Sequence, residues 1–290
     1  MLPRLTTSNL VRVNRRRPPM SRQRPAVACQ RFLLLCIALF GGCATPSERF
    51  LDDAERRGFT AQVAQSERHN LVVLRHGRPT AGESLHIYLD GDGTPMLSRH
   101  QIANDPSSRS RLILDLMERD PAPSVLVGRP CYYQGNKGCD PVLWTDQRYS
   151  EGIVAGLAQV IVAESDTAPE SPLTLIGYSG GGTLAMLLAP RLRRVERVVT
   201  VAANLDVTAW TAHHGYSALA GSLNPADAPP LPSHIRQLHL FGENDKNVPA
   251  ALMRHVAERS SNSAIRIVPG YNHACCWAKT WPAPIAERTN

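Results

Sequence analysis

The feature that most constrains the fold is the pentapeptide Gly177-Tyr178-Ser179-Gly180-Gly181. It follows a short apolar run at 173–176, typical of a buried strand, and precedes a helix-like stretch at 184–188. A sharp turn from strand to helix exposes the serine but crowds the backbone, so small residues must flank it. Serine is a poor nucleophile unless a base lies beside it. The pattern predicts Ser179 as a catalytic nucleophile, with the N–H of Gly180 facing the developing negative charge.

Around this turn, short apolar runs alternate with helix-like stretches along most of the chain. This alternation predicts an α/β fold, a mostly parallel sheet with helices on both faces. The predicted strands are at 71–74, 85–89, 124–127, 173–176, 195–201, 238–241 and 265–268, and the predicted helices at 112–117, 153–161 and 184–188. Residues 206–235 contain four prolines and interrupt the rhythm, which indicates an insertion over one edge of the sheet. A single domain is expected over 71–290.

With this pentapeptide between a strand and a helix, the chain resembles the α/β-hydrolase superfamily over about residues 70–285. In that family the acid and the histidine follow the serine in the order Ser, Asp, His, each at the end of a strand. The segment Phe241–Asp245, ahead of Val248-Pro249, matches the acid loop and points to Asp245. The segment Gly270–His273 follows the next strand and points to His273. The resemblance implies that His273 takes the proton of Ser179 and later gives it to the leaving group.

Other residues compete for these roles. Glu243 is two residues from Asp245 and is a possible acid, although Asp245, not Glu243, occupies the position that matches the acid of the family. Asp206 also ends a strand, and some members of the superfamily place the acid there, so it is the alternative acid. Among the other histidines, the pair His213-His214 is a candidate to line the pocket, and His239 and His255 are expected to be structural.

The oxyanion hole needs a second backbone donor, from the loop after an early strand. The run Asp90-Gly91-Asp92-Gly93 stands there and resembles the family's H-G motif, with Asp90 where histidine is frequent. The backbone N–H of Asp92 is the expected second donor. The run also looks like part of a calcium loop, but no acidic ligand set of the required spacing follows, so no metal is expected. Together with Arg129-Pro130-Cys131 and Trp144, these motifs resemble a group of bacterial α/β-hydrolase lipoproteins, which implies anchoring but supplies no substrate.

The N-terminal segment is typical of an export signal. Residues 1–42 contain eight arginines and no Asp, Glu or Lys, and they lead into nine apolar residues at 32–40. The net charge of the chain is +7, so the remaining residues sum to −1, which argues against a nucleic-acid partner. The run Leu39–Cys43 resembles the bacterial lipobox, which implies a lipid on Cys43 and a membrane surface as partner. Met20 is an alternative start, and residues 43–70 are expected to form a tether or a peripheral first element.

Four cysteines remain after the signal and Cys43, and four cysteines allow three pairings. In an oxidising compartment we expect Cys131 to pair with Cys139, closing a short loop. Cys275 and Cys276 then either form a vicinal bridge or stay reduced. A zinc site is disfavoured, because neither pair has finger-like spacing.

The sequence therefore predicts an exported serine hydrolase, tethered to a bacterial envelope membrane, that cleaves an ester or related acyl bond through an acyl-enzyme. The expected partner is a small-molecule or acyl substrate, and no cofactor is implied. A peptidase with the same three residues is an alternative, because the chemistry does not separate ester from amide. A non-catalytic envelope lipoprotein that keeps the fold is the other alternative.

Overall fold

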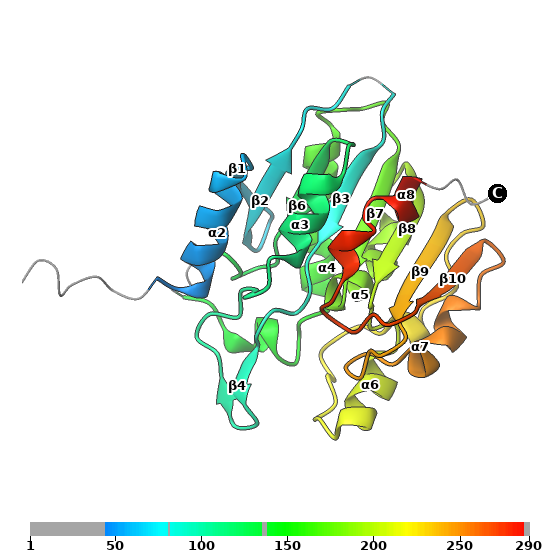
Figure 1. Cartoon of the computed structure of the whole chain (residues 1–290). Helices are drawn as coiled ribbons and strands as arrows, with labels where there is room; N and C mark the ends of the chain where they lie inside the picture. Colours follow the sequence, from blue (N-terminus) through cyan, green and yellow to red (C-terminus); the bar gives the residue numbers. More distant parts are fainter. Residues whose placement is uncertain (1–43, 81, 135–137, 287–290) are drawn as a thin grey trace, which may run out of the picture. The chain divides into compact units, whose positions relative to one another are not determined.

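The structure is a computed structural model that describes residues 44–80, 82–134 and 138–286. The described residues form an eight-stranded sheet in the order β1-β2-β6-β3-β7-β8-β9-β10 (Figure 1). β2 runs antiparallel to both neighbours, and the strands from β6 to β10 run parallel. The strands are β1 (Thr60–Gln65), β2 (Asn70–His76), β3 (Leu85–Leu89), β6 (Ser124–Val127), β7 (Leu173–Tyr178), β8 (Val195–Val201), β9 (Arg236–Gly242) and β10 (Ser263–Val268). The predicted mostly parallel α/β sheet is confirmed.

Helices cover both faces of this sheet (Figure 1). α4, α5 and α7 contribute to one apolar core, and α2, α3 and α8 to the core on the opposite face. Within β2, Leu71 and Val73 point into the first core and Val72 and Leu74 into the second, which is why the strand is apolar throughout. The helices are α2 (Pro46–Arg56), α3 (Leu112–Arg119), α4 (Glu151–Ser165), α5 (Gly180–Leu188), α6 (Val207–His214), α7 (Ala250–Ala257) and α8 (Ala283–Ala286). None of the helices in the described ranges is long and apolar enough to cross a membrane.

Shorter elements surround the carboxyl ends of the parallel strands. An antiparallel hairpin of β4 (Met96–Ser98) and β5 (Gln101–Ile102) projects on one side of that edge, and α6 lies on the other (Figure 1). Single turns of 3-10 helix span Pro141–Trp144, Ala189–Arg191, Pro225–Asp227 and Trp277–Lys279. The predicted insertion at 206–235 thus contains α6 and one 3-10 turn. It is attached to the segment before α4, because Leu223 N–H donates to the Tyr149 carbonyl at 3.1 Å.

Residues 43–70 were expected to form a tether or a peripheral first element, and the described part of that segment, 44–70, has the structure of the second. Thr45 begins α2 with a capping box to Glu48, and the edge strand β1 pairs with β2. Phe50 is fully buried in the core, so the folded body begins at Ala44 rather than at residue 71. This segment is a peripheral first element of the domain. The predicted signal at 1–42 and the predicted lipid site at Cys43 lie outside the described residues.

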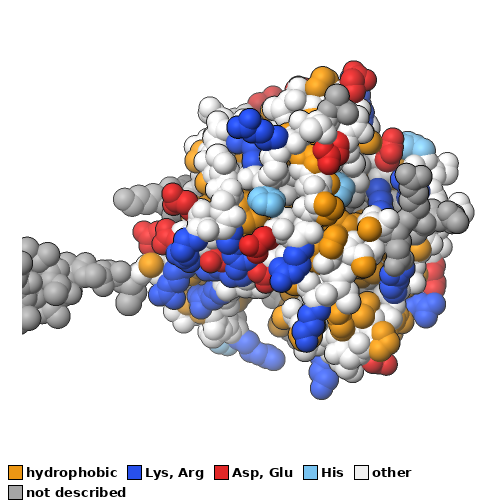
Figure 2. All heavy atoms as spheres, turned by 45° about the horizontal axis from the view of Figure 1, so that its top comes forward, with side chains coloured by type: hydrophobic (Ala, Val, Ile, Leu, Met, Phe, Trp, Pro, Cys, Tyr) orange, Lys and Arg blue, Asp and Glu red, His pale blue; other side chains and the backbone are white. Residues whose placement is uncertain are grey.

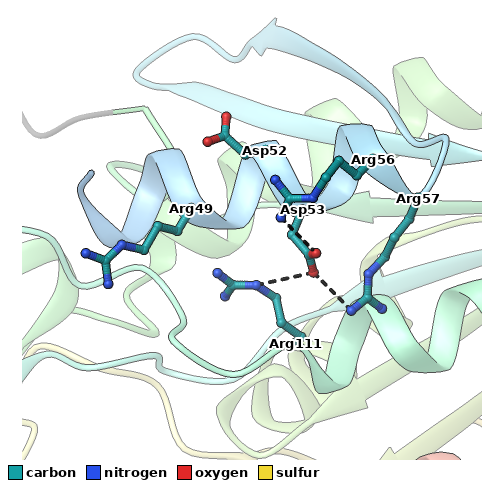
Figure 3. A pocket seen from close by; sticks show the side chains of 6 residues that line it. All are labelled: Arg49, Asp52, Asp53, Arg56, Arg57 and Arg111. Carbon is teal, nitrogen blue, oxygen red and sulfur yellow. Dashed lines mark hydrogen bonds and ion pairs between the residues drawn. The ribbon is translucent and has the colours of Figure 1, made fainter. Parts of the chain in front are cut away.

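The C-terminal end of α2 is joined to α3 by an ion pair between Arg57 and Asp115 at 2.5 Å, and Asp53 joins α2 to Arg111, just before α3. Asp53 lies 3.2 Å from Arg56, 3.0 Å from Arg57 and 3.4 Å from Arg111 (Figure 3). These groups line a hollow of about 400 Å³ together with Arg49 and Asp52. On this flank of the molecule basic and acidic side chains lie side by side (Figure 2). The hollow is therefore lined by both basic and acidic side chains, and none of the predicted site residues is among them.

Two cysteine pairs are bonded. Cys131 is joined to Cys139, with their Cα atoms 6.0 Å apart, as expected for the oxidised chain. Cys275 and Cys276 are joined to each other, which is one of the two states that the sequence allows. The first bond closes the loop after β6, and the second lies in the loop after β10, next to His273.

Candidate active site

Ser179 occupies the turn between β7 and α5. Its backbone has φ 52° and ψ −122°, a region that costs a residue with a side chain of the order of 1–3 kcal/mol. The turn is held by hydrogen bonds on both sides: Ser179 N–H donates to the Val201 carbonyl at 2.9 Å, and Gly182 N–H donates to the Ser179 carbonyl at 2.9 Å. The half-buried hydroxyl is thereby presented at the carboxyl edge of the sheet.

The glycines around Ser179 are required by close packing of backbone on backbone. A Cβ added at Gly177 would overlap the Gly181 carbonyl, and one added at Gly181 would overlap the Leu89 carbonyl at the end of β3. α5 therefore starts against both β7 and β3, which holds Ser179 close to the loop after β3. This contact is the physical reason for the run of small residues in the sequence.

Asp245 lies in the turn after β9, with a side chain that is fully buried. Its Oδ1 accepts hydrogen bonds from the backbone N–H groups of Asn247 at 2.9 Å and Val248 at 2.8 Å. Its Oδ2 lies 2.9 Å from Nδ1 of His273. The two backbone donors hold the carboxylate in one orientation, so only Oδ2 faces the imidazole.

His273 lies in the loop after β10 and completes a chain of hydrogen bonds. Its Nε2 lies 3.1 Å from Oγ of Ser179, within the reach of a nucleophile–base pair. The Tyr178 hydroxyl donates to the His273 carbonyl at 3.2 Å, and Trp277 Nε1–H donates to the same oxygen at 3.1 Å. The structure thus brings Ser179, His273 and Asp245 together although 94 residues separate the serine from the histidine.

The alternative acids have other partners. Oε2 of Glu243 accepts from the N–H of Gly270 at 2.9 Å. Oδ1 of Asp206 accepts from Ala209 N–H at 3.0 Å and caps α6, while Oδ2 pairs with His255 at 3.1 Å. Neither carboxylate has a contact with His273 within the described part of the chain, so Asp245 is the acid that the geometry favours.

The remaining histidines separate into two kinds. His239 is fully buried and hydrogen-bonded to Thr200 at 2.8 Å, and burial lowers its pKa to about 4. It is a neutral structural residue. His214, of the pair expected to line the pocket, lies 2.8 Å from the Asn247 carbonyl, and Trp210 Nε1–H donates to the same oxygen at 2.9 Å. The insertion therefore contacts the acid loop from the outside.

The loop after β3 lies directly against the nucleophile. A Cβ added at Gly91 would lie 3.3 Å from Cβ of Ser179, and one added at Gly180 would overlap the Asp92 carboxylate. The N–H groups of Gly180 and Asp92 have no acceptor among the residues that the structure describes. An oxyanion hole requires two free donors, one from the residue after the serine and one from the loop after an early strand.

The Asp90 side chain holds this loop through hydrogen bonds. Its Oδ1 accepts from the N–H of Gly91 at 2.7 Å, and its Oδ2 accepts from the Tyr133 hydroxyl at 2.7 Å. Burial raises the pKa of the Asp90 carboxyl. The residue that replaces the family's histidine thus fixes the backbone of the next residue by a short local bond.

The sequence did not predict the groups around the Asp92 side chain. Burial alone would raise the pKa of Asp92, but the guanidinium groups of Arg129 and Arg148 hold it below its ordinary value. Tyr149 contacts the same carboxylate. Arg129 follows the carboxyl end of β6, and Arg148-Tyr149 precedes α4. Two signals could have placed Arg129 at this edge: its position after a parallel strand, and the motif Arg129-Pro130-Cys131 noted in the sequence.

Comparison with known proteins identifies the fold. A scan against protein-family models finds no match, and a search of curated proteins finds none either. Solved structures do match. They include an esterase from Pyrococcus furiosus (TM-score 0.60, 13% identity, 84% of this chain and 93% of that one). Est1E from Butyrivibrio proteoclasticus matches with a TM-score of 0.51 and 14% identity over 78% of this chain and 95% of that one.

A third match is the alpha/beta hydrolase domain-containing protein 10 from mouse, with a TM-score of 0.50 and 16% identity over 74% of this chain and 90% of that one. At such identities the likeness establishes architecture and nothing finer. This chain has the α/β-hydrolase fold, as its motifs implied. Its strand order and its serine turn belong to that architecture.

Proposed function

We propose that this chain is a serine hydrolase that cleaves a carboxylic ester or a related acyl bond. The observation that supports the proposal is the continuous hydrogen-bond chain from Ser179 through His273 to the buried Asp245. A binding protein has no need of all three groups in this order, whereas acyl transfer needs a nucleophile, a base and a group that orients the base.

The chemistry follows from the positions of the atoms. Oγ of Ser179 attacks the acyl carbonyl while Nε2 of His273 takes its proton, and the N–H groups of Gly180 and Asp92 stabilise the oxyanion. His273 then returns the proton to the leaving alcohol, whose bond to the acyl carbon breaks, and an acyl-enzyme forms. Water, deprotonated by the same Nε2, attacks the acyl carbon and releases the acid and Ser179. Asp245 keeps the Nδ1 proton of His273 in place throughout.

The insertion limits the substrate. Between β8 and β9 the chain has 34 residues, containing α6 and one 3-10 turn, and this segment contacts Asp146 and Asn247. A segment of this size is short for a lipase lid. We therefore expect a small or well exposed acyl group rather than a long-chain lipid as substrate.

The proposal includes anchoring of the enzyme to an envelope membrane through a lipid on Cys43. The support is the lipobox-like run ahead of Ala44, where the folded domain begins. Mass spectrometry of the protein from membranes of a bacterial host should find a diacylglyceryl group on Cys43. A Cys43→Ser variant should lose it and leave the membrane fraction, and a membrane-bound, unmodified protein would contradict anchoring by this route.

The catalytic proposal is tested by hydrolysis of p-nitrophenyl acetate, with the matching anilide to separate ester from amide preference. Ser179→Ala should abolish turnover, with circular dichroism and melting temperature unchanged, because the hydroxyl is half-buried and at a turn. Ser84→Ala, a serine hydrogen-bonded at the start of β3, is the control and should keep full activity. Ester turnover that survives in Ser179→Ala would overturn the assignment.

A further inference from the structure

The carboxylate of Asp92 is held by three side chains, two of them arginines. Arg129 Nη1 lies 2.8 Å from Oδ1, and Arg148 Nη1 donates to Oδ2 at 3.1 Å. The Tyr149 hydroxyl lies 2.8 Å from Oδ1 and 2.7 Å from Oδ2. The backbone of the same residue is held as well, because the Tyr132 hydroxyl donates to the Asp92 carbonyl at 2.9 Å.

Burying the charges of this cluster costs desolvation free energy, which an apolar core would not. Arg129 and Arg148 are both buried, with exposed fractions of 4% and 8%. A buried ion pair contributes little net stability, since desolvation of the charges offsets their attraction. Nε and Nη1 of Arg129 are buried without a hydrogen-bond partner in the described part of the chain, so Nη1 meets Asp92 as an ion pair only. The guanidinium also lies over the rings of Tyr132 and Tyr149. The Asp92 carboxylate packs against Gly180, the residue after the nucleophile. This position suggests that the buried charges serve the active site rather than the stability of the fold.

The charges of the cluster suit an oxyanion hole. A lone carboxylate packed against Gly180 would oppose the negative charge that develops on the acyl oxygen. The two guanidinium groups offset the negative charge of the Asp92 carboxylate instead, and Arg129 keeps its charge at any pH at which the protein folds. The two arginines lower the pKa of the Asp92 carboxyl, which favours its ionised form.

We propose that Arg129, Arg148 and Tyr149 are positioning residues that act through Asp92. By holding its carboxylate, they fix the Asp92 N–H beside the N–H of Gly180, where the second bond to the oxyanion forms. The inference rests on the proposed hydrolase function. A donor must lie within a few tenths of an ångström of its place to act in the transition state, so a looser carboxylate lowers kcat and leaves substrate binding unchanged.

Tyr149→Phe tests this with the smallest change, since it removes only the hydroxyl. Tyr88→Phe is the matched control, because Tyr88 is equally buried and its hydroxyl donates to another buried carboxylate, that of Asp120. The hydrogen bonds of Tyr88 in the described structure join it to Asp120 and Trp281, not to Ser179, His273 or Asp245. We expect kcat for p-nitrophenyl acetate to fall about tenfold in Tyr149→Phe, with KM unchanged, and to stay within about twofold in Tyr88→Phe.

Two further readouts separate positioning from loss of stability. The affinity for phenylboronic acid, which forms a tetrahedral adduct on the serine, should fall in Tyr149→Phe by about the same factor as kcat. The pH profile of kcat/KM should keep its shape, because the substitution leaves the hydrogen bonds among Ser179, His273 and Asp245 in place. Equal kcat values in Tyr149→Phe and wild type, or equal losses in Tyr149→Phe and Tyr88→Phe, would overturn the proposal.

Arg148 gives a second pair of variants in case Tyr149→Phe does not fold. Arg148→Lys keeps the charge near Asp92 and Arg148→Gln removes it, so kcat should fall more in Arg148→Gln than in Arg148→Lys; equal values would contradict the proposal. The hydrolase function itself is judged separately. If the wild-type protein neither turns over the ester nor reacts with a fluorophosphonate at Ser179, both proposals are wrong. If the wild type is active and Tyr149→Phe has the same kcat, only the proposal about the Asp92 cluster is wrong.

Discussion

Replacing Asp245 by Asn is the perturbation whose effect on catalysis the structure defines most sharply. Oδ1 of Asp245 accepts two backbone N–H groups, from Asn247 and Val248, and Oδ2 faces Nδ1 of His273. In Asp245→Asn the amide oxygen must accept the two N–H groups, so the amide NH₂ faces Nδ1. Nδ1 then has to be the unprotonated nitrogen, and the proton moves to Nε2, the atom that must accept the proton of Ser179.

The expected loss is large because the variant holds the wrong tautomer in place. A triad histidine in the wrong tautomer costs about 10⁴ in kcat, or about 5.5 kcal/mol of transition-state stabilisation. The fold should change little, since the amide keeps both backbone hydrogen bonds and the residue keeps its size. The assay is kcat for p-nitrophenyl acetate, measured beside urea unfolding of the same preparation.

Asp206→Asn and Glu243→Gln are the controls, because each carboxylate has its own partner away from His273. Both variants should keep kcat within about threefold, and Asp206→Asn should keep most of the α6 cap, since Asn caps helices nearly as well as Asp. A loss in Asp206→Asn as large as in Asp245→Asn would show that the acid has been assigned to the wrong strand. An Asp245→Asn variant with more than about a tenth of wild-type kcat would refute the tautomer argument.

Three predictions concern stability. Since burial lowers the pKa of His239 from 6.5 to about 4, the stability that its neutral form provides is complete above about pH 6.5 and is lost as the pH falls toward 4. His239→Gln should remove about 2.5 kcal/mol of the drop in unfolding free energy between about pH 7.5 and about pH 4.5, and an unchanged urea-unfolding profile would contradict this. The double variant Cys131→Ser/Cys139→Ser should lower the unfolding free energy by about 2.5 kcal/mol through the freed loop, with no change if the bond does not form in the native protein. Gly181→Ala should cost about 1–3 kcal/mol and lower kcat, because its methyl group meets the Leu89 carbonyl; a fully active, equally stable variant would show that α5 can move away from β3.

The arrangement of the site could be predicted because it depends on strand ends. Ser179, Asp245 and His273 each follow an apolar run that becomes a parallel strand, and parallel strands bring their carboxyl ends to one edge. The run of β7 was visible because this strand is buried along its whole length, whereas β10 is an edge strand whose apolar run is interrupted by Arg266. The chain order of the acid and the base then needed only the family's topology.

The first helix and strand gave no comparable signal. α2 buries Phe50 and Ala54 among charged residues, and β1 is an edge strand with no fully buried residue. Such elements are held by contacts that form only after the sheet exists, such as the ion pairs between Asp53 and Arg111. The short hairpin of β4 and β5 is exposed throughout, and it was not predicted for the same reason.

The cluster around Asp92 could not be predicted from local patterns. Arg148 is 56 residues from Asp92 along the chain, and Tyr149 is 57. Arginines and tyrosines at such distances look like ordinary surface residues until the fold brings them to one point. The departure from the family's motif at Asp90 was visible, but the hydrogen bond from Tyr133 that accounts for it also comes from a distant segment.

The central claim is that Ser179 is an activated nucleophile, and labelling with a fluorophosphonate tests it most directly. The probe should react with the wild-type protein, and peptide mapping should find the adduct on Ser179. Labelling should be lost in His273→Ala, which keeps the serine but removes the base 3.1 Å from its hydroxyl. A well-folded wild-type protein that does not react, or a His273→Ala variant that reacts equally fast, would contradict the claim.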